Sequence, residues 1–197
     1  MVYFIPPRSP HFGGLWESAV KSAKYHLKRV LNDQKLTFEE LYTVIIQVEA
    51  CLNSRPITPV SESADDLEIL TPGHFLMGSS PSALPQEDIK GHNPNRLQRY
   101  QLLTQFIQSF WKRWQTEYLG NLQQRSKWRI RADSIKINDM VLVKEDNTPP
   151  MKWQLGRVVE LHTGSDGICR VVSLKTASGL IKRSTSRVCV LPFEDSN

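Results

Sequence analysis

The sequence predicts an α+β protein, with helices in the first two thirds of the chain and short strands in the last third. Apolar residues recur at helical spacing until about residue 127, whereas from Ile135 onward they alternate with polar residues. Turn-forming residues separate these alternating segments. With 197 residues, the chain is long enough for one or two small domains.

Two amphipathic helices are expected near the start of the chain. The first runs from about Gly14 to Asn32, and the second follows a capping box formed by Thr37 and Glu40 and ends at residues 53–56. Each helix has one apolar face, and two helices of this size need a further element to cover these faces. This region is therefore expected to be unstable alone.

Loops and a long helix are expected next. Residues 57–94 are rich in Pro, Ser, Asp and Gly, which predicts loops around one short helix, Pro72 to Met77, with Thr71 as its cap. A long helical segment from about Asn95 to Lys127 follows. Its apolar stripe contains Leu103, Phe106, Phe110, Trp114 and Tyr118. The spacing favours a packing stripe over a base-stacking surface, because helices are poor stacking platforms.

Four segments with period two predict strands, at residues 137–144, 156–161, 169–175 and 186–191. Four or five short strands within about 60 residues suggest a small closed barrel that folds independently. Trp153, which precedes the second segment, is expected to fill the mouth of this barrel.

The positive charge is concentrated in the second half of the chain, whose overall net charge is +5. Residues 1–90 hold eight Lys and Arg against eleven Asp and Glu, a net of −3. Residues 91–197 hold seventeen against nine, a net of +8. A basic half of this kind points to nucleic acid before it points to small acidic substrates.

A stripe of charged residues runs along one face of the first predicted helix. Glu17 lies in its first turn, and Lys21, Lys24 and Lys28 follow one, two and three turns later, so that all four share one face. The helix macrodipole favours a carboxylate at a helix start, and the lysines suit a polyanion that lies along the helix. The alternative is an ordinary first-turn glutamate followed by a solvated helix face.

The predicted strands and their loops carry further candidates for phosphate contacts, because backbone charge dominates affinity for DNA. These are Arg157, Arg170, Lys175, Lys182, Arg183 and Arg187. The alternative is the basic outer face that is usual for a soluble barrel.

No metal site is expected in this chain alone, because Cys51, Cys169 and Cys189 form no paired ligand spacing with the five histidines. Three cysteines without a pairing pattern fit a reducing compartment. The sequence has no run of about 18 apolar residues for a membrane helix. We therefore expect an intracellular protein without a membrane partner or a small-molecule substrate.

Three motifs carry a resemblance to a known family. Pro10, Gly14 and Glu17 match the frame Pro-x-x-x-Gly-x-x-Glu. Residues 50–56 read Ala-Cys-Leu-Asn-Ser-Arg-Pro, and residues 71–76 read Thr-Pro-Gly-His-Phe-Leu. In these motifs the chain resembles the integrase in the Pol polyprotein of Bel/Pao-type LTR retrotransposons, which are transposable elements.

The resemblance runs from about residue 3 to residue 192 and implies three regions. Residues 1–56 correspond to the carboxy-terminal remnant of a ribonuclease H-like catalytic core, which is mainly helical here. Residues 57–133 correspond to a loop and helical linker region, and residues 134–197 to an SH3-like β-barrel that binds DNA without sequence preference.

The resemblance also implies roles for single residues. Glu17 corresponds to the third catalytic acid of the family, and Lys21 and Lys24 correspond to lysines that contact the DNA end. The intact parent is a polynucleotidyl transferase that uses two Mg²⁺ or Mn²⁺ ions, and such chemistry needs several carboxylates. Residues 1–16 contain no Asp or Glu, so Glu17 can hold a metal only if partnered by the missing aspartates.

The chain is therefore expected to be a catalytically incomplete fragment that binds no cofactor alone, binds DNA and works in the nucleus if it is expressed. Two other functions stay open. A small barrel can recognise methylated lysine, but this task needs an aromatic cage, and from Ser134 onward the only aromatic residues are Trp153 and Phe193. A host-adopted protein-interaction module would use the long helix to form oligomers, which makes a second copy of the chain a candidate partner.

Overall fold

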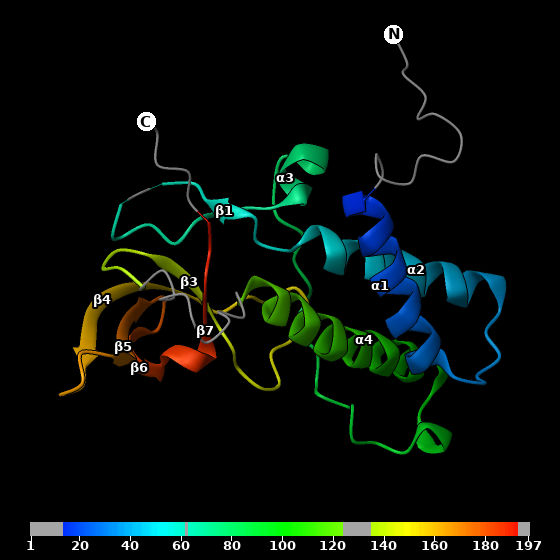
Figure 1. Cartoon of the computed structure of the whole chain (residues 1–197). Helices are drawn as coiled ribbons and strands as arrows, with labels where there is room; N and C mark the ends of the chain where they lie inside the picture. Colours follow the sequence, from blue (N-terminus) through cyan, green and yellow to red (C-terminus); the bar gives the residue numbers. More distant parts are fainter. Residues whose placement is uncertain (1–13, 62, 124–134, 193–197) are drawn as a thin grey trace, which may run out of the picture.

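The computed structural model describes residues 14–61, 63–123 and 135–192, and it confirms the α+β prediction (Figure 1). Helices form the first part of the described chain, and a five-stranded antiparallel sheet forms the last part. In Figure 1 the sheet lies on one side of the long helix α4 (Arg99–Leu122), and α1 and α2 lie on the other side. Pro10, Lys127, Ser134 and Phe193 lie outside the described residues.

The first two helices begin and end close to where the sequence predicts. α1 spans Gly14–Leu31, and Asn32 follows with a φ of 46°, a left-handed conformation that often ends helices. α2 spans Phe38–Asn53 and starts at the predicted capping box. The backbone N–H of Glu40 donates to the Thr37 hydroxyl at 3.3 Å, and the backbone N–H of Thr37 donates to the Glu40 carboxylate at 2.8 Å.

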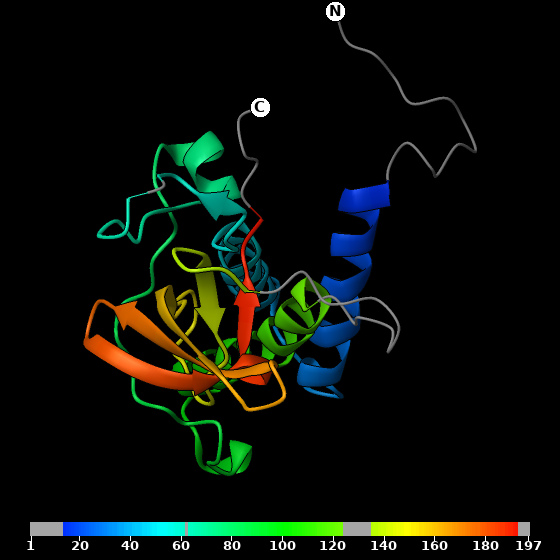
Figure 2. The ribbon, with the colours of Figure 1, turned by 60° about the vertical axis from the view of Figure 1, so that its left-hand side comes forward.

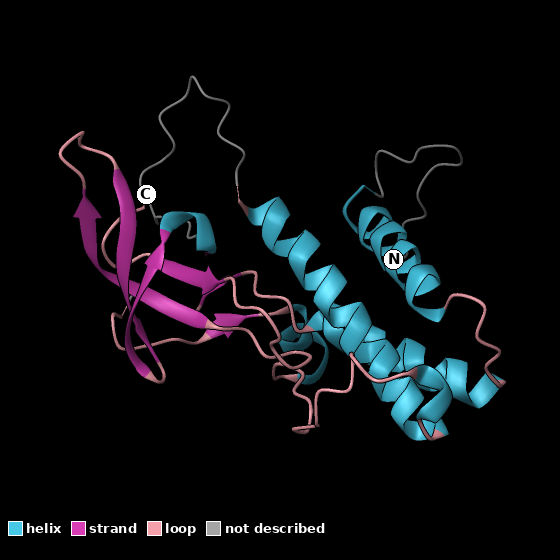
Figure 3. Cartoon of the chain, turned by 90° about the horizontal axis from the view of Figure 1, so that it is seen from below, coloured by secondary structure: helices cyan, strands magenta, loops and turns pink. Residues whose placement is uncertain are grey.

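The long helix α4 is the centre of the helical part, because both α1 and α2 pack against it (Figure 3). It begins later than predicted, since a 3-10 turn at Pro94–Arg96 is followed by extended backbone at Leu97 and Gln98. The shared core consists of Val44, Val48, Cys51, Leu102, Phe106, Ile107, Phe110, Trp111 and Trp114. The aromatic stripe of α4 therefore packs in the interior and does not offer bases a stacking surface.

One face of α2 remains uncovered. Val44, Val48 and Cys51 face the shared core, whereas a second set of apolar side chains is exposed. This set, which we name the α2 ridge, consists of Phe38, Leu41, Tyr42, Ile45 and Ile46. The α2 ridge, like Val20 of α1, is apolar surface that α4 does not cover.

The sheet is open in the described residues, so the prediction of a closed barrel is wrong. Its strands are β3 (Met140–Val143), β4 (Leu155–Thr163), β5 (Cys169–Thr176), β6 (Gly179–Ser184) and β7 (Val188–Val190). The order is β6-β5-β4-β3-β7, so β6 and β7 are the edges. A 3-10 turn leads from β6 to β7, and the Gln123 side chain after α4 donates to the carbonyls of Ser186 and Val188. The end of the helical part thus occupies carbonyls next to β7 that a closing strand could have used.

The strand β3 is buried on both faces and joins the sheet to α4. Val141 and Val143 pack on one face with inner residues of β4 and β5. Met140 and Leu142 pack on the opposite face with Leu119 of α4. One face of the sheet is therefore covered by the helical part of the molecule.

Trp153 lies between β3 and β4 and contacts α4. Its ring centroid is 4.9 Å from that of Trp111, 6.0 Å from that of Trp114 and 5.5 Å from that of Tyr118. Its indole N–H donates to the Ser54 hydroxyl, after α2, at 3.3 Å. The predicted position in a barrel mouth is wrong, because this loop turns toward the helices.

Two short strands and a short helix lie between α2 and α4. β1 (Thr58–Pro59) pairs antiparallel with β2 (Ile69–Leu70), and α3 spans Pro72–Met77, as the sequence predicts. The segment between β1 and β2 lies against the sheet, since Leu67 packs in the cluster that joins β3 to α4. This segment binds the side chain of Arg157, one of the residues that the sequence predicts to contact phosphates.

Candidate nucleic-acid interface

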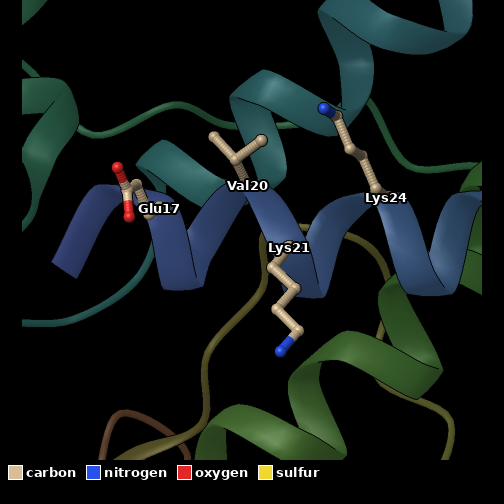
Figure 4. Close-up of a pocket in the computed structure, with 4 residues that line it drawn as sticks. All are labelled: Glu17, Val20, Lys21 and Lys24. Atoms are coloured by element: carbon tan, nitrogen blue, oxygen red, sulfur yellow. The ribbon is translucent and has the colours of Figure 1, made fainter. Parts of the chain in front are cut away.

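The charged stripe of α1 lines an open hollow on the surface of the molecule. Glu17, Lys21 and Lys24, together with Val20, form this hollow, whose volume is about 380 Å³. Figure 4 shows the Lys21 and Lys24 side chains extending to opposite sides of the helix axis, with Glu17 near the start of the helix. All four residues are exposed, and so is Lys28 one turn later. The predicted stripe therefore exists as a surface.

The lysines of this stripe have no acidic partner in the described part of the chain. Among residues 14–61, 63–123 and 135–192, no carboxylate lies within ion-pairing distance of Lys21, Lys24 or Lys28. Residues 1–13, which precede α1, also contain no Asp or Glu in the sequence. The positive charge along α1 is thus available to a polyanion.

Contacts with α4 fix which face of α1 points outward. The Ser22 hydroxyl donates to the Glu117 carboxylate at 2.8 Å, and Nε2 of the buried His26 lies 2.6 Å from its other oxygen. Burial raises the pKa of Glu117, but the hydrogen bonds from Ser22 and His26 outweigh this effect, so its pKa lies below the usual value. Because Ser22 and His26 face α4, the lysine stripe faces solvent.

Two further α1 residues belong to this surface and were not singled out by the sequence. The guanidinium carbon of Arg29 lies 3.6 Å from the ring centroid of Tyr25, and Tyr25 is 51% exposed. Their spacing of four residues is the signal that could have identified them, since side chains at i and i+4 meet on a helix. In Figure 2, α1 stands at the edge of the molecule, away from the sheet.

The predicted sheet contact Arg157 is not accessible to a phosphate. Arg157 is only 3% exposed, and its guanidinium donates to the carbonyls of Asp66 at 3.1 Å, Asn138 at 3.0 Å and Ser61. It anchors the segment between β1 and β2 to the sheet. The alternating pattern of β4 puts Arg157 on the opposite face of the strand from the buried Val158, but it cannot show that a distant segment covers Arg157.

Four other predicted sheet contacts form ion pairs with nearby carboxylates. Arg170 pairs with Asp166 at 2.6 Å, Arg183 with Glu145 at 2.8 Å, Arg187 with Asp146 at 3.6 Å, and Lys175 with Asp65. The hydrogen bond from Arg170 lowers the pKa of Asp166 to about 2, so this pair stays charged at neutral pH. Lys182 is exposed and has no ion pair among the described residues. Most of the cationic groups on the sheet are therefore locally neutralised.

Residues of β4 and β5 form a small polar cluster that the sequence did not predict. Nε2 of His162 lies 2.7 Å from the Ser173 hydroxyl, and this hydroxyl donates to the Glu160 carboxylate at 3.2 Å. The cluster depends on the register between the two strands, which pairs Glu160 with Ser173.

Across the residues that the structure describes, no three His, Cys, Asp or Glu side chains gather in a way that could hold a metal.

Comparison with known proteins gives one match. A family of unknown function, DUF5641, matches residues 98–191, which run from the start of α4 to the residue after β7. No curated protein and no solved structure matches the chain. None of the described helices is long and apolar enough to cross a membrane. The matched segment contains α4 and the whole sheet, and it does not contain α1.

Proposed function

We propose that this chain is a DNA-binding fragment of a Bel/Pao-type retrotransposon integrase, and that α1 supplies its main contacts with DNA phosphates. The resemblance between residues 3 and 192 supports the integrase origin. In this proposal α1 and α2 are the end of a ribonuclease H-like core, and the sheet derives from an SH3-like domain. The site of action is the nucleus, where the integration of DNA takes place.

The observation that carries the proposal is the difference in charge compensation between α1 and the sheet. Lys21, Lys24 and Lys28 are exposed and have no ion-pair partner in the described residues. A phosphate that approaches the sheet must instead compete with a carboxylate for most of the cations there. Since neutralising phosphates and releasing counterions drives DNA binding, the uncompensated lysines contribute more to affinity.

Glu17 is, in this proposal, the third acid of a two-metal site. One carboxylate cannot clamp two cations, so Mg²⁺ or Mn²⁺ requires two aspartates that residues 1–16 do not contain. The chain alone therefore binds DNA and neither cuts nor joins it. The exposed position of Glu17 in the first turn of α1 agrees with an acid that extends from the helix into a shared site.

Charge-removing variants test the proposal. Lys21→Gln, Lys24→Gln and Lys28→Gln are combined in one variant, and Lys175→Gln, Arg183→Gln and Arg187→Gln in a matched control that loses the same formal charge. Binding to a fluorescent duplex of about 20 base pairs is measured between about 50 and 200 mM salt. We expect the α1 variant to lose about tenfold in affinity at the lowest salt and to reduce the salt slope by about 2 to 3, and the control to lose about twofold.

Circular dichroism and thermal melting establish that both variants remain folded. Equal losses in the two variants, or a larger loss in the sheet variant, contradict the assignment to α1. Binding that does not change with salt contradicts phosphate recognition altogether.

A protein-interaction module is the second candidate, and the α2 ridge favours it. Large exposed apolar patches on soluble proteins often mark protein contacts. The aromatic stripe of α4 does not support it, because this stripe is buried. The α2 ridge makes a second copy of the chain the partner to test, by sedimentation of a Phe38→Ser/Ile45→Ser variant beside a Leu84→Ser/Leu180→Ser control. A concentration-dependent dimer that only the first variant abolishes would favour this candidate.

The aromatic residues around Trp153 do not support a function in the recognition of methylated lysine. These rings come close enough to form a cage, but Trp111 is 1% exposed and Trp114 is 5% exposed. The cluster is filled by its own side chains, and it has no open face for a methylated ammonium group.

A further inference from the structure

The Tyr25 ring on α1 combines three features that suit the recognition of an unpaired base. It is half exposed, it lies directly beside the lysine stripe in the sequence, and its orientation is fixed on two sides. The Arg29 guanidinium covers one face of the ring at 3.6 Å. The His26 ring contacts it edge-on, with centroids 5.2 Å apart and an interplanar angle of 80°.

The neighbours of Tyr25 make this ring more than a solvated aromatic side chain. His26 is itself held by Glu117 of α4, so the contact that orients Tyr25 is anchored in the core of the molecule. Arg29 and the ring attract each other through the cation and the aromatic quadrupole. A ring held in this way loses little conformational freedom when a base stacks on it.

The cations beside Tyr25 can hold the phosphates of the same strand. Lys21, Lys28 and Arg29 are four residues before, three residues after and four residues after Tyr25, so they surround it on the helix surface. Proteins that bind single strands combine aromatic rings for the bases with cations that follow the backbone. Bases inside a duplex are already stacked and cannot reach such a ring.

We propose that Tyr25, oriented by His26 and Arg29, stacks on one unpaired base, so that the α1 surface prefers single-stranded or overhanging ends to blunt duplex. This inference rests on the proposed function, because it uses the phosphate contacts of the α1 stripe. It limits the site to one nucleotide, since Tyr25 is the single exposed aromatic ring among residues 17–31, the part of α1 whose side chains the structure describes. A helix is a poor platform for many bases but is adequate for one.

Four probes and three variants test this inference in the full chain. The probes are a fluorescent 20-nucleotide oligothymidylate, the corresponding oligouridylate, a blunt duplex and the same duplex with a short 3′ overhang. Tyr25→Ala removes the ring, Tyr25→Leu keeps apolar bulk without aromaticity, and Tyr25→Phe keeps the ring. Thermal melting monitors folding, which the exposed position of Tyr25 should leave intact.

We expect the unmodified chain to bind the single strands and the overhang more tightly than the blunt duplex. Tyr25→Ala and Tyr25→Leu should each lose about tenfold on the single-stranded probes and less than about twofold on the blunt duplex. Tyr25→Phe should keep the preference. Equal affinity for both strand types, equal losses on all probes, or a Tyr25→Leu variant that keeps the preference would each overturn the inference. A preference for RNA over DNA identifies the single strand as RNA.

The same probes separate this inference from the proposed function. If the triple glutamine variant of Lys21, Lys24 and Lys28 loses duplex binding while Tyr25→Ala changes only the single-stranded probes, both conclusions stand. If the triple variant binds duplex normally while Tyr25→Ala loses the single strand, the stacking site stands and the assignment of duplex contacts to α1 fails. If Tyr25→Ala changes nothing, the stacking inference fails alone.

Discussion

The helix α1 and the sheet differ both in how they attach to α4 and in how their positive charge is neutralised. α1 contacts α4 mainly through one face, on which Ser22 and His26 bind Glu117, and its outer face carries lysines that have no ion-pair partner among the described residues. The sheet shares a core with α4, and most of its cations are paired. The net charge of a region therefore does not show where its uncompensated cations lie.

The chemistry of turns explains why the sheet is neutralised and α1 is not. Three of the four carboxylates that pair with lysines and arginines of the sheet, Glu145, Asp146 and Asp166, lie in loops that join its strands, where Asp is a preferred turn residue. Asp166 in the β4–β5 turn and Asp146 in the β3–β4 loop are examples, and each meets an arginine from a neighbouring strand or turn. A helix such as α1 has no such turns. Its sequence contains one acidic residue, Glu17, which precedes all of its lysines.

The largest expected effect comes from cutting the sheet away from α4. A fragment of residues 134–197 exposes the side chains of Met140 and Leu142 that pack on Leu119, whereas a fragment of residues 98–197 keeps Leu119 and its contact with them. We expect only the longer fragment to unfold cooperatively in urea, monitored by circular dichroism. A cooperative transition in the shorter fragment would show that the sheet folds independently, as its strand pattern suggests.

Local features of the fold were predictable from the sequence, and long-range features were not. The Thr37–Glu40 capping box and the short helix Pro72–Met77 depend on neighbouring residues, and both appear as predicted. The position of Trp153 and the burial of Arg157 depend on segments about 40 to 100 residues away, so no local pattern contains them. For the same reason the lysine stripe of α1 was predictable, while three of the four ion pairs of the sheet, those of Lys175, Arg183 and Arg187, were not.

The substitution Trp153→Ala disrupts the contact between the sheet region and the helices to a smaller extent. This change removes the indole that packs against Trp111, Trp114 and Tyr118 and loses the hydrogen bond to Ser54. We expect the free energy of unfolding of the full chain to fall by about 3 kcal/mol in chemical denaturation. Trp153→Phe keeps part of the packing and should cost less than half as much. A loss below about 1 kcal/mol for the alanine variant would mean that the sheet and the helices are held together elsewhere.

Unmasking the cations of the sheet sharpens the comparison of charges. A variant with Asp65→Asn, Glu145→Gln and Asp146→Asn frees Lys175, Arg183 and Arg187 from their carboxylates. We expect its affinity for duplex DNA to rise about fivefold at about 50 mM salt, with a steeper salt dependence.

The matched control for this variant removes three carboxylates that form no ion pair in the described residues, through Asp33→Asn, Glu49→Gln and Glu87→Gln. It gains the same net charge and should raise the affinity less than about twofold. Equal gains in the two variants would mean that net charge decides DNA binding, and the distinction between paired and unpaired cations would fail.

The smallest expected effect concerns the contact that orients α1. Because the pKa of Glu117 is lowered in the folded protein, its ionised form contributes stability at pH values above its unfolded pKa of about 4.5. This contribution is lost as the pH falls through the lower folded pKa, where the carboxylate is protonated in both states. Glu117→Gln should therefore lower the melting temperature by about 1 to 2 °C at neutral pH, and the difference should shrink as the pH falls below about 4.5. The effect is small because the Glu117 side chain is partly exposed and screened by solvent. The affinity of this variant for duplex DNA should also weaken, since the contact with Glu117 keeps the lysines of α1 facing outward. An unchanged melting temperature at neutral pH would show that the apolar residues of α1 orient the helix without Glu117.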